Sequence, residues 1–281
     1  MSTFARLSNT DSEAALDLLM REPDRNIIMI HNVRVFGMEP GETRFHGDYV
    51  GRWAAGRLDA IGAVYGGLGS FFLYAADDGS VEGMAECMLE FSGIPSFMSG
   101  RASHLERLFE GFDGLEGVRH WRYPSDHMVL SGRVRTGIDT CAGRFTETRD
   151  LDTVVKMQAA MGKELFDADP ADTSGLRELL AQQIGSGGAR VLESDGAVVS
   201  KAEATVAEGV GAQLGGVYTM PGHRGRGYAT SCVGSLCEHV LARAPLVALT
   251  VDKDNYPAKN VYHRIGFEKA DDWMIVTTVP F

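Results

Sequence analysis

The apolar and polar positions in the second half of the chain follow two different periods. Over residues 151–166 and 176–184 the apolar residues recur at the spacing of an amphipathic helix. After the second helix, apolar runs are separated by Asp195-Gly196 and Glu208-Gly209, dipeptides that favour tight turns between strands. This pattern predicts three antiparallel strands, at 189–193, 197–206 and 210–220.

The rest of this half predicts alternating helices and strands. An apolar stripe indicates a helix over 227–241, and a short apolar run indicates a buried strand over 246–251. Pro257 and Gly266 mark the start and end of a short helix, and Phe267 opens a last strand that includes 273–278. A strand–helix–strand passage implies a parallel crossover, so the sheet is expected to be mixed although mostly antiparallel.

The first half shows roughly the same order of elements, which indicates an internal duplication. We expect its helices at 14–20, 26–36, 81–91 and 105–112, and its strands at 49–55, 58–65, 70–75, 94–98 and 119–134. A chain of 281 residues suits two domains, and the polar stretch 135–144 separates them. The predicted fold class is therefore α+β, with domains at 1–135 and 140–281, each a mixed, mostly antiparallel sheet flanked by helices.

A loop rich in glycine and arginine joins the strand at 210–220 to the following helix. It reads His-Arg-Gly-Arg-Gly-Tyr-Ala-Thr over 223–230. Glycine lets a backbone approach a ligand closely, and the first amides of a helix lack intrahelical partners. The helix dipole favours an anion at this end, and Arg224 and Arg226 can add charge-assisted hydrogen bonds. The loop is therefore predicted to bind a pyrophosphate.

Two segments of this half resemble motifs of the GNAT superfamily of N-acetyltransferases. The run Arg-x-x-Gly-x-Ala at 224–229 is similar to the superfamily's pyrophosphate motif, and it lies between the expected strand and helix. The segment 254–267 is similar to a later motif, in which an Asn precedes a short helix that bears a Tyr, followed by Gly-Phe. The resemblance covers about 140–281. It implies a GNAT-type N-acetyltransferase that uses acetyl-CoA as acyl donor.

The resemblance also implies roles for individual residues. Tyr262 matches the general acid that donates a proton to the departing sulfur of CoA. Asn255 matches a residue that hydrogen-bonds the pantetheine arm or stabilises the local loop, and a turn or helix cap is its alternative role. The strand before the loop would pair with the pantetheine through its backbone. The implied cofactor-binding set is Val217, Tyr218, Thr219, Arg224, Gly225, Arg226, Gly227, Tyr228, Ala229, Thr230 and Asn255.

Adjacent glycines precede this strand segment, at Gly215-Gly216. Such pairs favour a β-bulge, and we expect one that separates two strands to admit the acyl-CoA. Many superfamily members have a glutamate on this strand, but here the strand contains no acid. Glu203 on the neighbouring strand is the substitute that we expect as catalytic base. A surface ion pair between Glu203 and Lys201, or a water chain with Gln213 orienting the amine, is the alternative.

The first half has no matching phosphate loop. In its place, residues 75–81 contain Asp77 and Asp78, and two carboxylates would repel a pyrophosphate. We therefore expect a degenerate GNAT-like domain at 1–135 that forms one wall of the acceptor pocket. The catalytic domain is expected at 140–281.

Composition narrows the choice of partners. A net charge of −11 disfavours nucleic acid and anionic membranes, and it reflects either a cationic acceptor or solubility alone. The sequence contains no apolar run long enough to span a membrane and no secretory signal pattern, so a cytoplasmic location is expected. No Cys or His cluster has zinc spacing, and no metal is expected. The oligomeric state is open, with a homodimer as one alternative.

The sequence therefore predicts an N-acetyltransferase that moves an acetyl group from acetyl-CoA to the primary amine of a small molecule or peptide. The amine would attack directly, in a ternary complex. A non-catalytic protein that binds or senses acyl-CoA is the alternative. Acyl-CoA donors with longer chains also remain open.

Overall fold

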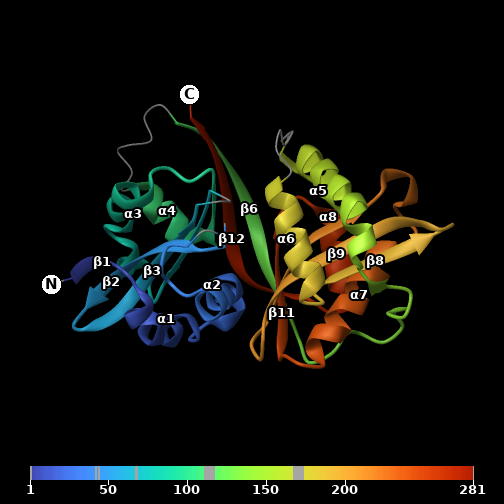
Figure 1. Cartoon of the computed structure of the whole chain (residues 1–281), viewed down its shortest axis with the longest axis horizontal. Coiled ribbons are helices and arrows are strands. Elements are labelled where there is room, and N and C mark those ends of the chain that lie inside the picture. Colours follow the sequence, from blue (N-terminus) through green and yellow to red (C-terminus); the bar gives the residue numbers. More distant parts are fainter. Residues whose placement is uncertain are drawn as a thin grey trace. The chain divides into compact units, whose positions relative to one another are not determined.

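The structure is a computed structural model that describes residues 2–41, 43, 45–66, 69–110, 118–166 and 174–280 (Figure 1). The chain divides into two compact units. The first contains Met1–His127 together with Ala270–Phe281, and the second contains Met128–Lys269. The sequence predicted a boundary at 135–140 and assigned the last strand to the C-terminal domain. In the structure most of that strand belongs to the first unit.

The two halves of the chain repeat one order of elements, namely a strand, two helices, three strands, a helix, a strand, a helix and a final strand. In the first half these are β1 (Ser2–Arg6), α1 (Ser12–Leu19), α2 (Pro23–Phe36), β2 (Gly47–Ala54), β3 (Arg57–Tyr65), β4 (Ser70–Ala75), α3 (Met84–Ser92), β5 (Phe97–Arg101), α4 (Ala102–Glu110) and β6 (Val118–Ser131). In the second half they are β7 (Arg144–Phe145), α5 (Leu151–Phe166), α6 (Ser174–Gly185), β8 (Ala189–Ser194), β9 (Ala197–Ala207), β10 (Gly211–Thr219), α7 (Tyr228–Leu241), β11 (Leu246–Asp252), α8 (Tyr256–Ile265) and β12 (Glu268–Pro280).

This order confirms the predicted succession of elements. The helix predicted at 151–166 has the observed bounds of α5, and the other predicted elements of the second half differ at their ends by a few residues. The short strands β1 and β7 were not predicted. Residues 111 and 112 of the helix predicted at 105–112 lie outside the described residues.

Each unit is built on a mixed sheet, as predicted. In the first unit the strand order is β1-β2-β3-β4-β5-β12, where β4 and β5 are parallel and the other neighbours are antiparallel. In the second unit the order is β6-β11-β10-β9-β8-β7, with β10 and β11 parallel. β12 of the second half therefore belongs to the sheet of the first unit, and β6 of the first half, whose residues from Met128 on lie in the second unit, neighbours β11. The pairing of β12 with β5 explains why residues 270–281 belong to the first unit.

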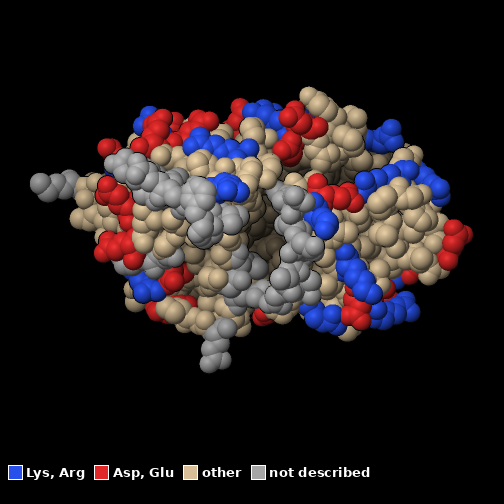
Figure 2. Space-filling model, turned by 90° about the horizontal axis from the view of Figure 1, so that it is seen from above, with Lys and Arg blue, Asp and Glu red and all other residues tan. Residues whose placement is uncertain are grey.

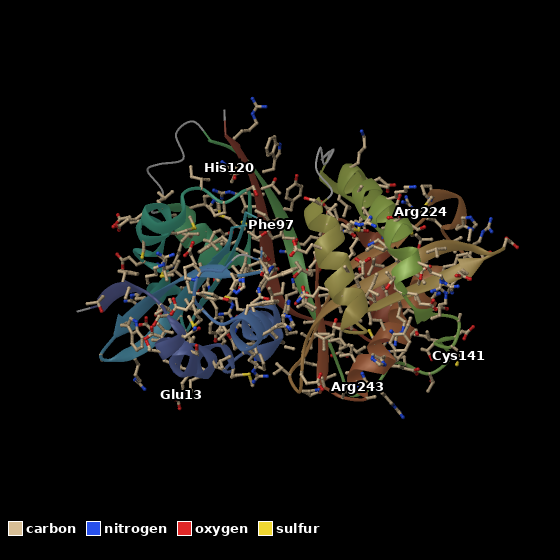
Figure 3. The ribbon with its side chains drawn as sticks, in the orientation of Figure 1. Glu13, Phe97, His120, Cys141, Arg224 and Arg243 are labelled. Carbon is tan, nitrogen blue, oxygen red and sulfur yellow. The ribbon has the colours of Figure 1, made fainter. Side chains whose placement is uncertain are left out.

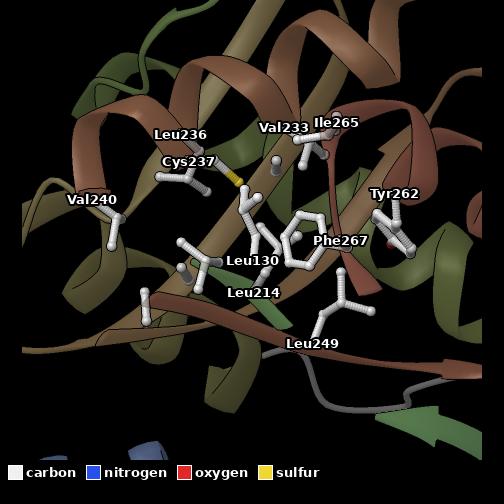
Figure 4. Packing of buried hydrophobic residues seen from close by; sticks show 14 of the residues in the cluster. Leu130, Leu214, Val233, Leu236, Cys237, Val240, Leu249, Tyr262, Ile265 and Phe267 are labelled. Atoms are coloured by element: carbon white, nitrogen blue, oxygen red, sulfur yellow. The ribbon is translucent and has the colours of Figure 1, made fainter. Parts of the chain in front are cut away.

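Helices cover both faces of the sheet in the second unit. On one face, Leu151 and Val154 of α5 and Leu180 of α6 pack against Val191 of β8. On the other face, α7 and α8 bury a larger apolar cluster against β9, β10 and β11 (Figure 4). This cluster includes Leu214, Val233, Leu236, Leu249, Tyr262, Ile265 and Phe267. Burial of such side chains is the main favourable contribution to folding.

The surface of the second unit carries both signs of charge. On the face seen in Figure 2, lysine and arginine side chains are spread over this unit, and acidic side chains lie between them. The net charge of the whole chain is nevertheless −11. No helix within the described ranges is both long and apolar enough to cross a membrane.

Candidate functional site

β10 contains a β-bulge at its adjacent glycines. The antiparallel pairing with β9 joins Gly215 to Glu203 and then Tyr218 to Lys201, so β10 advances by one residue more than β9. Gly216 has a φ of +56°, in the left-handed region that glycine adopts without a steric penalty. This geometry confirms the predicted bulge.

β10 and β11 separate at the same point. Their parallel pairing covers residues 212–214 and 247–249, and Leu214 with Leu249 is its last pair. β10 continues to Thr219 and β11 to Asp252, and no further pairing joins these two described segments. Their facing edges thus leave backbone hydrogen-bonding groups outside the ladder. An extended chain that carries amide groups would match such a gap.

The loop after β10 presents a row of backbone amides. Gly225 (φ +76°) and Gly227 (φ +83°) turn the chain into α7. The N–H groups of residues 225–230 have no acceptor within the described part of the chain, and no side chain caps this helix end. A Cβ added at either glycine would have nothing within 4 Å, so the space in front of the loop is open. The open amides and the helix dipole together favour an anion.

The two arginines of the loop differ in their contacts. Arg224 donates from Nη2 to Oε2 of Glu164 on α5 at 2.7 Å, and from Nε to the carbonyl oxygen of Thr219 at 3.0 Å (Figure 3). The hydroxyl of Tyr218 donates to the other oxygen of Glu164 at 2.6 Å. These hydrogen bonds, first that from Tyr218, lower the pKa of the Glu164 carboxyl. Arg226 is exposed and forms no ion pair with the described residues.

A buried ion pair lies directly beneath the bulge. Lys201 is 0% exposed and Glu203 is 4% exposed. Lys201 Nζ donates to Oε1 of Glu203 at 2.7 Å, to Oε1 of Gln158 at 2.6 Å, and to the carbonyl oxygen of Gly216 at 2.9 Å. Burial raises the pKa of Glu203 and lowers that of Lys201, while their mutual attraction opposes both shifts. The sequence left a surface ion pair between Lys201 and Glu203 as the alternative. The ion pair is present, but it is buried, so its predicted surface location is wrong.

Tyr262 lies in the apolar cluster between α7 and α8. Its ring centroid is 5.8 Å from that of Phe267, in an edge-to-face arrangement (Figure 4). Burial, with a smaller contribution from Cys237, raises the pKa of the Tyr262 hydroxyl above its usual value near 10. The hydroxyl therefore stays protonated at neutral pH, as a proton donor must.

Asn255 acts as the N-cap of α8, where its Oδ1 accepts a hydrogen bond from the Ala258 amide at 3.2 Å. The cap role that the sequence left open is thus present. A contact of Asn255 with a cofactor stays a prediction.

The remaining predicted cofactor residues border the bulge and the loop. Val217 packs towards the α7 side, where Tyr228 also contacts the apolar cluster. The hydroxyl oxygen of Thr219 lies 2.9 Å from that of Ser200. Thr230 is buried in the first turn of α7. The predicted set therefore follows one continuous segment of the second unit, apart from Asn255.

Two polar residues of α5 were missed at the sequence level, Gln158 and Glu164. Their positions on an amphipathic helix are typical of a solvated face. No motif distinguishes them, and only the packing of α5 beside β10 reveals their contacts with Lys201, Tyr218 and Arg224.

The equivalent region of the first unit is built differently. β3 and β4 pair without a register shift, from Ala60 with Ala75 to Tyr65 with Ser70. Asp77 Oδ1 accepts from the Ser80 amide at 2.9 Å and from the Ser80 hydroxyl at 3.1 Å. Asp77 thus caps the short 3-10 turn at 78–81, whereas α3 begins at Gly83 without a side-chain cap. A Cβ added at Gly83 would lie 2.7 Å from the ring of Phe4, so the space before this helix is filled, unlike that before α7.

Comparison with known proteins gives consistent matches. The family model of FR47-like proteins matches residues 195–276, which include β10, α7, β11 and α8. A mycothiol acetyltransferase from Nocardioides sp. is 28% identical over 223 residues, which is 73% of this chain and 73% of that protein.

Solved structures share the fold at low sequence identity. A Drosophila protein superposes with a TM-score of 0.73 at 13% identity, over 100% of this chain and 99% of the other. A tandem GNAT protein from the clavulanic acid biosynthesis pathway has a TM-score of 0.58 at 17% identity, over 100% and 98%. A GCN5-related N-acetyltransferase from Sphaerobacter thermophilus has a TM-score of 0.59 at 16% identity, over 100% and 96%. These likenesses concern the fold of the whole chain.

Proposed function

We propose that the chain is an acyltransferase of the GNAT superfamily, whose second unit transfers an acetyl group from acetyl-CoA to a primary amine; the FR47-like match and the similarity to a mycothiol acetyltransferase support this. The observation that carries this proposal is the row of unpaired amides at 225–230, which lies at the end of a bulged strand that has separated from its parallel neighbour. An anion site and an extended gap in one continuous segment match a ligand with a pyrophosphate and an amide-bearing arm.

In this proposal the amides of residues 225–230 bind the pyrophosphate, and the exposed Arg226 adds a charge-assisted hydrogen bond. Arg224 would contribute after release from Glu164. The backbone of 217–219 pairs with the pantetheine arm along the edge that β11 leaves free. Asn255 at the start of α8 would contact the same arm.

The reaction places three demands on the site. The attacking amine must be neutral, although the pKa of a lysine-like amine is about 10.4. The developing oxyanion needs a hydrogen-bond donor, which a backbone N–H of the bulged strand can provide. As the nitrogen–carbon bond forms and the carbon–sulfur bond breaks, Tyr262 would give its proton to the sulfur, and a base would take one from the nitrogen.

Glu203 is our candidate for that base. A Cβ added at Gly216 would collide with Oε2 of Glu203. The carboxylate of Glu203, from the neighbouring strand, therefore occupies the place that a side chain of residue 216 would take. Oε1 bonds to Lys201, whereas Oε2 has no hydrogen bond with the described residues. Burial raises the pKa of Glu203, which strengthens it as a proton acceptor. Proton transfer would be direct or through a water oriented by Gln213.

The acceptor in this proposal is a small molecule rather than a peptide. The name of the relative from Nocardioides sp., mycothiol acetyltransferase, supports a small acceptor. The assignment of a cofactor-free domain to 1–135 and a catalytic domain to 140–281 stays a prediction, as does a cytoplasmic location.

The second candidate, a protein that binds acyl-CoA without turnover, is favoured by the burial of Glu203 in an ion pair. Calorimetric titration with acetyl-CoA, followed by a thiol-release assay over a panel of amines, separates the two. We expect one binding site per chain and thiol release with at least one amine. Binding without release from any amine would support the sensor, and no binding would refute both.

A further inference from the structure

Lys201 combines complete burial with a full set of hydrogen bonds. An ammonium group has three donors, and each donor of Lys201 has its own acceptor on a different element. Gln158 belongs to α5, Glu203 to β9, and Gly216 to the bulge of β10. One side chain thus joins the three elements that meet where β10 leaves β11.

The bulge depends on these contacts. Gly216 lies between the paired positions Gly215 and Tyr218, so it has no partner in the β9 ladder. Its carbonyl oxygen accepts a hydrogen bond from Lys201 Nζ at 2.9 Å. Its left-handed φ and the carboxylate of Glu203 beside its Cα together exclude a side chain at this position. Lys201 and Glu203 therefore define the path of the backbone through the bulge.

Stability alone does not account for this pair. Removing a lysine and a glutamate from water costs several kcal/mol per ion, and apolar replacements of similar volume are often equally stable. A buried charge with a specific backbone acceptor instead fixes geometry, because losing the acceptor would leave the ammonium unpaired in a dry environment. The backbone that it fixes is the segment proposed to pair with the pantetheine arm.

We propose that Lys201 is a positioning residue, which holds the Gly216 carbonyl outside the β9–β10 ladder and so keeps the edge of β10 available to the acyl-CoA arm. Glu203 balances the charge of Lys201, in addition to its candidate role as base. This inference rests on the proposed function, because it assumes that an acyl-CoA occupies the gap between β10 and β11.

The test compares CoA affinity among folded variants, by calorimetry, with thermal unfolding measured in parallel. CoA itself is the probe, because it allows no turnover. K201M/E203Q removes both charges at similar volume, E203Q keeps Lys201 and its bond to Gly216, and K156M makes the same lysine change at an exposed site on α5. We expect K201M/E203Q to unfold near the wild-type temperature but to bind CoA about tenfold or more weakly. E203Q and K156M should bind within about twofold of wild type.

The outcomes are distinguishable. If the wild-type protein binds CoA and K201M/E203Q binds it equally tightly, the inference is wrong and the proposed function still stands. If K201M/E203Q fails to fold, E203Q decides the question, since a tenfold loss there would show that Lys201 and its backbone bond are not sufficient. Wild-type protein that does not bind CoA would overturn the inference together with the proposed function.

Discussion

Gly227→Asp should abolish measurable CoA binding while leaving the fold intact. Gly227 is the N-cap of α7, with a φ of +83° and open space where a Cβ would lie. An aspartate fits there sterically, but its carboxylate would lie among the amides of 225–230. It could accept hydrogen bonds from the first turn of α7, as N-cap aspartates do, and would compete with the pyrophosphate for the same donors.

The expected loss of CoA affinity follows from charge repulsion and from the hydrogen bonds that the aspartate would take from the ligand. Two unit charges about 4 Å apart in water repel by about 1 kcal/mol, so the two phosphates together contribute about 2 kcal/mol. One charge-assisted hydrogen bond taken from the ligand contributes a further ~1.5–3 kcal/mol. The dissociation constant should therefore rise by at least about two orders of magnitude.

Gly209→Asp is the matched control. Gly209 also has a positive φ, +69°, and an added Cβ there would have nothing within 4 Å, but it lies in the β9–β10 turn away from the loop. Both variants should lose about 1–2 kcal/mol of stability from the left-handed backbone, so only the difference between them reports on the ligand. Calorimetry with CoA measures this difference. Unchanged affinity in Gly227→Asp, or an equal loss in both variants, would mean that the anion site lies elsewhere.

Two further changes test other parts of the site, and a third tests the stability of the second unit. Tyr262→Phe should lower kcat about 100-fold or more with little change in CoA affinity, whereas Tyr256→Phe, at an exposed position of the same helix, should retain full activity. Glu164→Gln should free its arginine partner and raise CoA affinity by up to about fivefold in calorimetry; weaker binding would contradict a competition between the carboxylate and the ligand. Arg144 lowers the pKa of the Asp150 carboxyl, so this pair stabilises the fold above the ordinary aspartate pKa and loses its contribution as pH falls through the lowered value. Asp150→Asn should therefore cost about 1.5–3 kcal/mol in urea unfolding at pH 7 and progressively less as the pH is lowered below the ordinary aspartate pKa, and a cost that does not fall with pH would refute this linkage.

Features with a local cause could be predicted from the sequence. The hairpin at Asp195-Gly196 requires positive φ at both residues, and they have φ values of +54° and +76°. The bulge at Gly215-Gly216 arises because Gly216 adopts a conformation that other residues avoid. The open amides of the loop at 225–230 were predictable for the same reason, since two glycines and a helix start are sufficient to leave amides open.

Features that depend on distant partners were not predictable. The exchange of final strands rests on the pairing of β12 with β5, which is separated from it by most of the chain. Lys201 and Glu203 alternate along a strand as exposed residues often do, and their burial follows from α5, which covers them with Gln158. A periodicity argument assigns a residue to a face of the sheet, but it does not tell which helix covers that face.

The repeated topology shows how two units with one order of elements can differ at the loop that the proposed function assigns to the pyrophosphate. Both units have a parallel strand pair followed by a helix, so the backbone supplies similar donors in each. In the first unit α3 also begins at a glycine without a side-chain cap, but the ring of Phe4 fills the space where a Cβ of Gly83 would lie. The regular pairing of β3 with β4 also holds the strand without a bulge. In the second unit the space in front of Gly227 is open, and Lys201 takes a strand carbonyl out of the ladder. Substitution of Phe4 by a small residue would therefore open the space before α3 but would not create the gap for an extended arm, because the two features arise from different residues.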